Sequence, residues 1–345
     1  MIPFHQRLEF LHPLQDKTRV SELMADPQTE VFDTISKQIE EWEAIRRYSP
    51  LSEKSFDPNG IWVYYPWSRR LVRILNEEQF VEVRTNRNRN KLTYQEQQIL
   101  SQKRVGIIGL SVGKATAITL AMERAFGEIR LADFDTLELS NLNRIHAGIH
   151  HLGIPKWELV AREILEIDPF LKVIGYPDGI HPDNLSGFLT TGGKLDVLVD
   201  ECDSLDIKIL CRLAARDLLI PVLMETSDRG MLDVERFDLT PDRPILHGLI
   251  DHLDIAELRH LKTSEEKAPF VQAILGADQI SDRLRESMAD IGTHLLTWPQ
   301  LASAVALGGA VITDTWRRMV LGEYRSSGRF YVDLSQLVSH SNFPV

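Results

Sequence analysis

The residues best suited to binding a nucleotide are a turn of small residues at 109–113 and an acid further along the chain. The turn reads Gly-Leu-Ser-Val-Gly, and Gly109 and Gly113 let backbone N–H groups approach phosphate oxygens. Asp133 directly follows an apolar run. A carboxylate in this position can accept a hydrogen bond from a ribose hydroxyl. Ser111 departs from the pattern, because dinucleotide-binding turns normally have glycine there. The residues predict nucleotide binding, with a similar fold that binds no nucleotide as the alternative.

Strands and helices must hold these residues in place. Residues 105–108 are a β-branched apolar run typical of a buried parallel strand, and residues 128–132 form a second such run ending at Asp133. Between them, residues 114–126 have small and apolar side chains at helical spacing. Further helices are expected at 156–167, 182–189 and 205–218, and further strands at 172–176, 195–200, 221–225 and 232–237. The alternation predicts an α/β fold, a Rossmann-like doubly wound, mostly parallel sheet with helices on both faces.

Four motifs follow the expected strand ends in a fixed order. They are Asp133-Phe134-Asp135, Leu139-Ser140-Asn141-Leu142-Asn143-Arg144, Gly153-Ile154-Pro155-Lys156 and Val199-Asp200-Glu201-Cys202-Asp203-Ser204. Over residues 95–322 the chain resembles the ThiF/HesA/MoeB adenylyltransferases, the ubiquitin-activating-enzyme-like superfamily. Its Gly-Leu-Ser-Val-Gly and Met-Glu-Thr-Ser-Asp-Arg-Gly segments resemble a bacterial branch often fused to a nitroreductase-like domain. The resemblance implies an ATP-dependent enzyme that activates a carboxylate as an acyl-adenylate and releases pyrophosphate.

The resemblance also implies a role for each motif residue. The expected nucleotide-binding residues are Gly109, Ser111, Gly113, Asp133, Asn141, Arg144, Lys156 and Arg87. Arg87 is included because the superfamily has an arginine shortly before the first strand that reaches ATP phosphates, sometimes those of the partner subunit; Arg89 is the alternative. The expected catalytic residues are Arg144, Lys156 and Asp203. Asp203 matches the magnesium-binding aspartate, so the implied cofactors are ATP and Mg²⁺.

Three positions depart from the superfamily pattern. Ser111 and Val112 replace a glycine pair, so the phosphate turn must have a different shape. Ile145 replaces the glutamine that often follows the arginine. Lys114 stands where a small residue is usual, and it could add a phosphate contact of its own. Two alternative functions therefore remain. The altered turn is compatible with a catalytically degenerate nucleotide-binding scaffold, and the half-Rossmann pattern alone is also compatible with a nicotinamide- or flavin-dependent oxidoreductase.

Composition narrows the setting. The 345 residues carry a formal net charge of -11, which argues against a nucleic-acid or anionic-membrane surface. The two cysteines, Cys202 and Cys211, exclude a disulfide framework and a four-cysteine zinc site, so no structural zinc is expected. Acidic neighbours should raise the pKa of Cys202, and we expect both cysteines to be packing residues rather than thioester nucleophiles. Without a secretory signal or a bilayer-length apolar segment, a cytoplasmic protein is expected.

The chain divides into an N-terminal extension, residues 1–95, and a ThiF-like nucleotide-binding adenylation domain, residues 96–345. In the extension, residues 29–47 read as an amphipathic helix and residues 61–65 as a strand. Thr93 and Glu96 form a capping box at the start of a short helix. Residues 240–297 correspond to the crossover loop of the superfamily, and residues 298–322 to a long C-terminal helix.

The partners are expectations that follow from the resemblance. The substrate would be a small protein or peptide with a free C-terminal carboxylate. A nitroreductase-like protein is a possible companion, and the long helix at 298–322, rich in small residues, is compatible with a homodimer or with packing on its own sheet.

Overall fold

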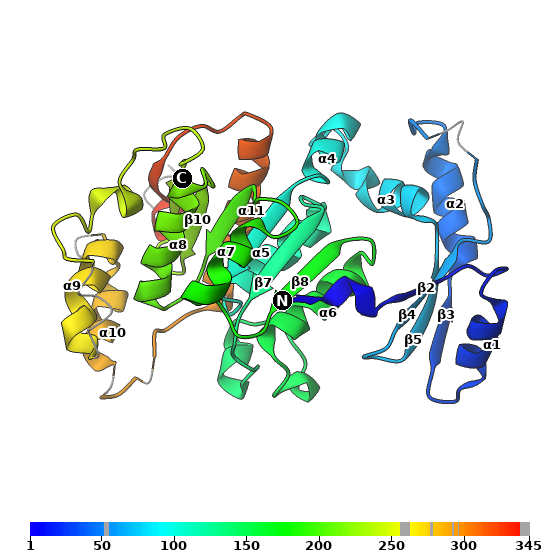
Figure 1. The fold of residues 1–345 in the computed structure, drawn as a ribbon, viewed down its shortest axis with the longest axis horizontal. Coiled ribbons are helices and arrows are strands. Elements are labelled where there is room, and N and C mark those ends of the chain that lie inside the picture. The colour runs from blue at the N-terminus through cyan, green and yellow to red at the C-terminus, as the bar shows by residue number, and fades with distance from the viewer. Residues whose placement is uncertain (52–54, 256–262, 277–278, 292, 296, 339–345) are drawn as a thin grey trace, which may run out of the picture.

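A central eight-stranded sheet organises the chain in the computed structural model, which describes residues 1–51, 55–255, 263–276, 279–291, 293–295 and 297–338 (Figure 1). The strand order is β1-β8-β7-β6-β9-β10-β11-β12. Strands β8, β7, β6, β9 and β10 are parallel, whereas the pairs β1–β8, β10–β11 and β11–β12 are antiparallel. The strands are β1 (Ile2–Pro3), β6 (Arg104–Ile108), β7 (Glu128–Ala132), β8 (Lys172–Tyr176), β9 (Val197–Asp200), β10 (Val222–Thr226), β11 (Met231–Glu235) and β12 (Gly328–Tyr331). The predicted mostly parallel α/β fold is confirmed.

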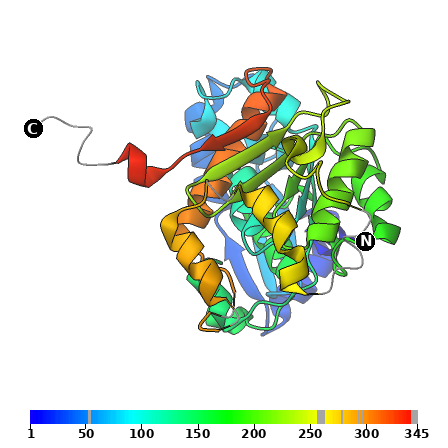
Figure 2. The same ribbon diagram turned by 90° about the vertical axis from the view of Figure 1, so that its left-hand side faces the viewer.

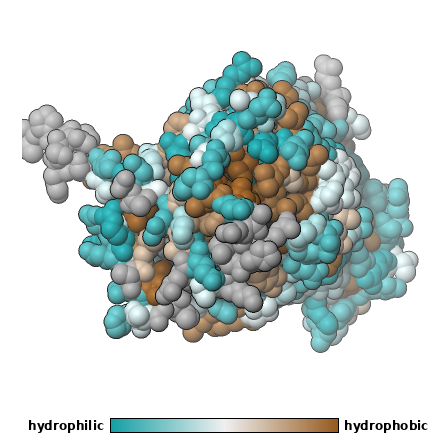
Figure 3. Space-filling model, turned by 60° about the vertical axis from the view of Figure 1, so that its left-hand side comes forward, coloured by the Kyte–Doolittle hydropathy of each residue, from teal (hydrophilic) through white to brown (hydrophobic). Residues whose placement is uncertain are grey.

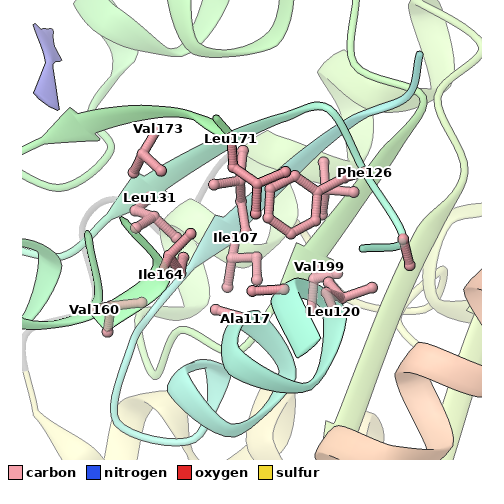
Figure 4. Close-up of a cluster of buried hydrophobic side chains, with 14 of the residues drawn as sticks. Ile107, Ala117, Leu120, Phe126, Leu131, Val160, Ile164, Leu171, Val173 and Val199 are labelled. Atoms are coloured by element: carbon pink, nitrogen blue, oxygen red, sulfur yellow. The ribbon is translucent and has the colours of Figure 1, made fainter. Parts of the chain in front are cut away.

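Helices cover both faces of this sheet (Figure 1). One face carries α5 (Gly113–Glu123), α6 (Lys156–Ile167) and α11 (Ala302–Val320), and the other carries α7 (Pro182–Thr190) and α8 (Leu205–Asp217). On the first face, Ile107, Leu131, Val173 and Val199 come from four adjacent strands and pack against Ala117 and Leu120 of α5 and Val160 and Ile164 of α6 (Figure 4). These side chains are almost fully buried, so the site at the sheet edge stands on a close-packed core.

Strand register brings the motif residues to one edge of the sheet. Ile108 pairs with Ala132 on one side and with Asp200 on the other. The next residues along the chain, Gly109, Asp133 and Glu201, therefore leave the sheet side by side. The strand order reverses between β6 and β9, and ligands of open α/β sheets bind in the crevice at such a reversal.

The N-terminal region forms a smaller sheet of order β2-β4-β5-β3. Its elements are β2 (Glu9–Leu11), α1 (Lys17–Ala25), β3 (Glu30–Asp33), α2 (Ile35–Arg46), β4 (Ile61–Tyr65), β5 (Arg70–Ile74), α3 (Glu77–Thr85), the 3-10 helices η1 (Phe4–Arg7) and η2 (Asn86–Asn88), and α4 (Tyr94–Leu100). The helix predicted from residue 29 is wrong over its first turn, because β3 pairs with β5 there. Tyr65 and Trp67 hydrogen-bond to Leu165 and Glu166 of α6, so these aromatic residues dock the extension. The capping box of Thr93 and Glu96 is confirmed.

The segment between β11 and β12 covers one end of the sheet (Figure 2). It contains η5 (Ile245–Gly248), α9 (Ser264–Leu275), α10 (Asp282–Asp290) and α11, and β12 is followed by α12 (Leu334–Leu337). In α11, an added Cβ at Gly309 would lie 2.8 Å from the backbone of Ala115, so this glycine allows α11 to pack closely on α5.

Hydrophobic side chains gather near the centre of the face of the molecule that Figure 3 shows. Among the described helices, none is long and apolar enough to cross a bilayer.

Candidate active site

A cleft of about 1240 Å³ lies at the carboxyl ends of β6, β7 and β9. Seven of the predicted site residues line it, namely Gly109, Ser111, Asp133, Asn141, Arg144, Lys156 and Asp203. The short 3-10 helices η3 (Leu139–Asn143) and η4 (Ile149–His151) lie in the loop that leads from β7 to α6. Ile180 and Ile207 add an apolar side to the cleft, which suits a base or another flat apolar group.

The turn after β6 needs its first glycine. Gly109 has φ +86, and an added Cβ would lie 2.4 Å from the carbonyl oxygen of Glu201. Gly113 begins α5, where a Cβ would lie 2.7 Å from Cγ2 of Ile107. The turn therefore packs directly on the core and directs the N-terminus of α5 toward the cleft.

Asp133 ties the turn to the end of β7. Its Oδ2 accepts a hydrogen bond from the backbone N–H of Leu110 at 2.7 Å, and its Oδ1 accepts one from Asp135 at 2.8 Å. Burial raises the pKa of Asp133, although these two hydrogen bonds oppose the shift. Asp133 borders the cleft while it holds the phosphate turn in position.

Lys156 and Arg144, the two cations that line the cleft in the predicted site, are held by polar side chains. Lys156, the first residue of α6, places Nζ 2.8 Å from Oδ2 of Asp135 and is largely buried. Arg144 donates from Nε to Ser111 Oγ at 3.1 Å and from Nη1 to Asn143 Oδ1 at 2.9 Å. Burial lowers the pKa of Arg144 and the nearby charge of Asp203 opposes this shift, but an arginine stays protonated.

Asn141 organises the loop that carries Arg144. Its Oδ1 accepts a hydrogen bond from the backbone N–H of Glu138 at 3.1 Å, in the capping arrangement of η3. Asn143 donates from Nδ2 to the carbonyl of Gln300 at 2.8 Å. The segment 298–300 thereby closes one side of the cleft. This role could not be predicted from the sequence, because it depends on a contact between distant parts of the chain.

A buried charge network supports the loop of Asp203. Asp200 is fully buried, accepts a hydrogen bond from Lys208 Nζ at 3.0 Å and forms an ion pair with Arg212. Arg212 also pairs with Glu235 at 2.6 Å. Lys208 is therefore held by Asp200 rather than free to meet a phosphate. Asp200 belongs to one of the predicted motifs but had no predicted role, and Arg212 lies outside those motifs.

Cys202 belongs to the same network. Its Sγ lies 3.0 Å from Oδ1 of Asp200. Burial raises its thiol pKa well above the ordinary value, and the Asp200 carboxylate raises it further. The pKa of Cys202 is thus raised in the expected direction, and the acidic neighbour that contributes is Asp200. A high thiol pKa disfavours the thiolate form.

Two predicted cations lie elsewhere. The ammonium of Lys114 pairs with Glu163 of α6 and is almost fully buried, so it is not positioned as an additional phosphate ligand. Arg87 is exposed in η2, next to Asn88, which donates to the carbonyl of Glu123 at 3.3 Å. Glu123 ends α5, about 15 Å of helix from the phosphate turn. Arg87 is not among the residues described as lining its own chain's cleft, and a role toward a second subunit stays a prediction.

The acidic residues of the cleft suit a magnesium ion that is bound together with substrate phosphates. Within the described part of the chain, no three His, Cys, Asp or Glu side chains group as metal ligands. Asp203 is exposed at the cleft and offers a single carboxylate. Magnesium commonly binds one or two carboxylates together with substrate phosphates and water, so Asp203 suits a metal that arrives with a nucleotide.

A smaller cavity of about 250 Å³ adjoins the cleft. Ser111, Arg144, Glu201 and Asp203 line both spaces. The smaller cavity continues between the ends of β10 and β11 and the helices α9 and α10. The site thus has two connected parts that meet at Arg144.

The doubly wound sheet, the turn at the strand reversal and the cations around the cleft define a nucleotide-binding protein of the Rossmann class. The chain belongs to the ThiF family, which matches residues 85–277.

Relatives extend over different parts of the chain. The uncharacterized protein MT1398 of Mycobacterium tuberculosis (strain CDC 1551 / Oshkosh) is 43% identical over 323 residues, which are 93% of this chain and 44% of that protein. The tRNA threonylcarbamoyladenosine dehydratase of Escherichia coli (strain K12) is 28% identical over 145 residues, 41% of this chain and 53% of the relative. The chain thus spans about half the length of these curated relatives or less.

Solved structures share the fold. PaaA aligns with a TM-score of 0.52 and 20% identity, over 75% of this chain and 81% of that one. The E. coli tRNA N6-threonylcarbamoyladenosine dehydratase TcdA in complex with ATP aligns with a TM-score of 0.51 and 18% identity, over 72% of this chain and 98% of TcdA.

Proposed function

We propose that the chain is a magnesium- and ATP-dependent adenylyltransferase that activates the C-terminal carboxylate of a small protein or peptide. The observation that carries this proposal is the convergence of Ser111, Arg144, Lys156 and Asp203 on one cleft at the N-terminus of α5. Binding of ATP and AMP by the related TcdA supports a nucleotide in this position.

The reaction is a displacement at phosphorus. A carboxylate oxygen of the substrate attacks the α-phosphorus of ATP, the bond from that phosphorus to the oxygen bridging to the β-phosphate breaks, and pyrophosphate leaves with the electron pair. Negative charge grows on the phosphate oxygens during this step, so catalysis depends on cations and backbone donors aimed at them.

The chain's residues divide this work. Arg144, held by Ser111, stands where the two cavities meet and would neutralise charge on the α-phosphate. Lys156 would exchange part of its contact with Asp135 for a phosphate oxygen. Nδ2 of Asn141, whose Oδ1 is held by the backbone of Glu138, and the N-terminus of α5 would donate to the remaining phosphates. Magnesium bound by Asp203 would neutralise charge on the departing pyrophosphate.

The altered glycine turn supports this activity rather than a degenerate scaffold. Ser111 accepts a hydrogen bond from Arg144, and in the proposed reaction its hydroxyl would position this arginine. We also propose a homodimer and a nitroreductase-like companion. Both partners follow from the family resemblance alone.

Product analysis tests the reaction class. The protein would be incubated with Mg²⁺, ATP, candidate peptides and hydroxylamine as an acyl acceptor, and the nucleotides separated by chromatography. Peptide-dependent AMP and peptide hydroxamate are expected, with both lost in Lys156→Ala. Formation of ADP and phosphate would identify a different use of ATP and contradict adenylation.

A further inference from the structure

The smaller cavity has walls that no nucleotide motif provides. Its apolar lining comes from the ends of β10 and β11 and from α9 and α10, and includes Met224, Met231, Val271, Ile274, Leu275 and Leu284. Apolar walls of this kind gain free energy when they bury a hydrophobic group. Methionine side chains adapt to several shapes, so the cavity suits a range of apolar groups.

The helices that form these walls are fixed to the sheet. Asp228, which follows β10, accepts hydrogen bonds from the N–H and hydroxyl of Ser281 at 2.8 and 2.5 Å, and Ser281 caps α10. Arg229 donates to the carbonyl of Gln279 at 2.7 Å. Because both contacts come from the loop between β10 and β11, the cavity is built by the fold rather than left between two loosely placed helices.

Charge in the cavity argues against an acidic occupant. Lys208 is already paired with Asp200, and Asp203 and Asp228 add negative charge. Burial raises the pKa of Glu225 to about 8, so this carboxyl is mostly neutral at neutral pH. The wall formed by Glu225 is therefore mostly uncharged at neutral pH, and the one cation of the lining that forms no ion pair with a carboxylate, among the residues described, is Arg144 at the junction with the cleft.

We propose that this cavity takes the side chain of the substrate's C-terminal residue and selects an apolar residue such as leucine, methionine or phenylalanine. The inference rests on the proposed adenylation. The attacking carboxylate must lie beside Arg144, where the α-phosphate would be, and on the side of the phosphorus opposite the departing pyrophosphate. In a C-terminal residue the side chain branches one carbon from that carboxylate, and the apolar cavity opens at the same point.

The experiment uses the full chain and a set of peptides that differ only in the last residue, which is Gly, Leu, Met, Phe, Asp or Lys. ATP–pyrophosphate exchange gives kcat/KM for each peptide. The expected order places Leu, Met and Phe at least tenfold above Gly and Asp below all of them. A preference for Gly or Asp overturns the inference.

Variants of α9 connect this preference to the cavity. Val271→Trp fills the cavity and should lower kcat/KM for the Leu, Met and Phe peptides at least tenfold, which removes their advantage over the Gly peptide. Val271→Ala should shift preference toward Phe. Gln272→Trp, on the exposed side of the same helix, is the matched control and should behave as the unmodified protein.

The outcomes separate the two proposals. Exchange that does not depend on the last side chain, or that Val271→Trp and Gln272→Trp alter alike, overturns the inference and leaves adenylation standing. Mg-ATP binding without exchange for any peptide overturns both. Melting curves of the three variants exclude misfolding as the cause of a lost preference.

Discussion

The guanidinium of Arg144 donates its Nε hydrogen to the hydroxyl of Ser111, with 3.1 Å between the two atoms. Ser111 is the residue that breaks the glycine pattern of the turn after β6. The serine that replaces glycine here therefore links the turn after β6 to the arginine of the loop after β7. Both residues line the cleft and the adjoining cavity.

Removing that hydroxyl should weaken catalysis without unfolding the protein. Ser111→Ala deletes one hydrogen bond to a charged donor, worth about 1.5 kcal/mol, so kcat/KM for ATP should fall about tenfold. Ser186→Ala, an exposed serine on α7, is the control and should leave kcat/KM unchanged. Equal activity of Ser111→Ala and Ser186→Ala would show that Ser111 does not position Arg144.

Glu225 should make stability depend on pH. Its folded-state pKa is raised to about 8 from an ordinary 4.5, so folding favours the neutral acid. The free energy of unfolding should therefore fall as pH rises from 4.5 to about 8 and then level off.

The measurement is the melting temperature of Glu225→Gln relative to the unmodified protein. The variant has no charge to bury, so its advantage should be greater at pH 9 than at pH 5. Glu286→Gln, exposed on α10, serves as control. A difference that stays constant across this pH range would contradict the buried neutral acid.

Arg212 should be among the residues that stability depends on most. Its guanidinium is fully buried between Asp200 and Glu235, so Arg212→Ala leaves the buried carboxylate of Glu235 without its cation and Asp200 with Lys208 alone. Breaking a buried pair in this way costs about 3–5 kcal/mol. Urea unfolding should show this loss, whereas Arg216→Ala, partly exposed on the same helix, should cost less than about 1 kcal/mol. Similar losses in both variants would exclude a special role for the network.

Much of the fold could be predicted, because the apolar pattern of a buried strand or helix begins and ends at recognisable residues in the sequence. The helix at 156–167 and the strands at 128–132 and 172–176 have the predicted bounds. β3 was missed because Val31 continues the helical spacing of Ile35 and Ile39, while pairing with β5 decides the local structure. β12 was missed because it is a short edge strand whose place depends on pairing with β11.

The candidate site divides in the same way. Residues that directly follow parallel strands could be brought together from sequence, since those strand ends share one edge of the sheet. The ion pair of Lys114 with Glu163 could not be predicted, because it joins two helices distant in sequence. The cavity beside Met224 and Val271 could not be predicted either, since its walls meet only in the folded chain.

The most direct test of the account is ATP–pyrophosphate exchange with a peptide that ends in leucine. The unmodified protein should exchange label only when ATP, Mg²⁺ and the peptide are all present. Arg144→Ala and Asp203→Ala should each lower the rate at least a hundredfold, and Asp217→Ala, exposed at the end of α8, should not change it. Exchange that persists in Arg144→Ala and Asp203→Ala, or tight ATP binding with no exchange for any carboxylate, would contradict adenylation at this cleft.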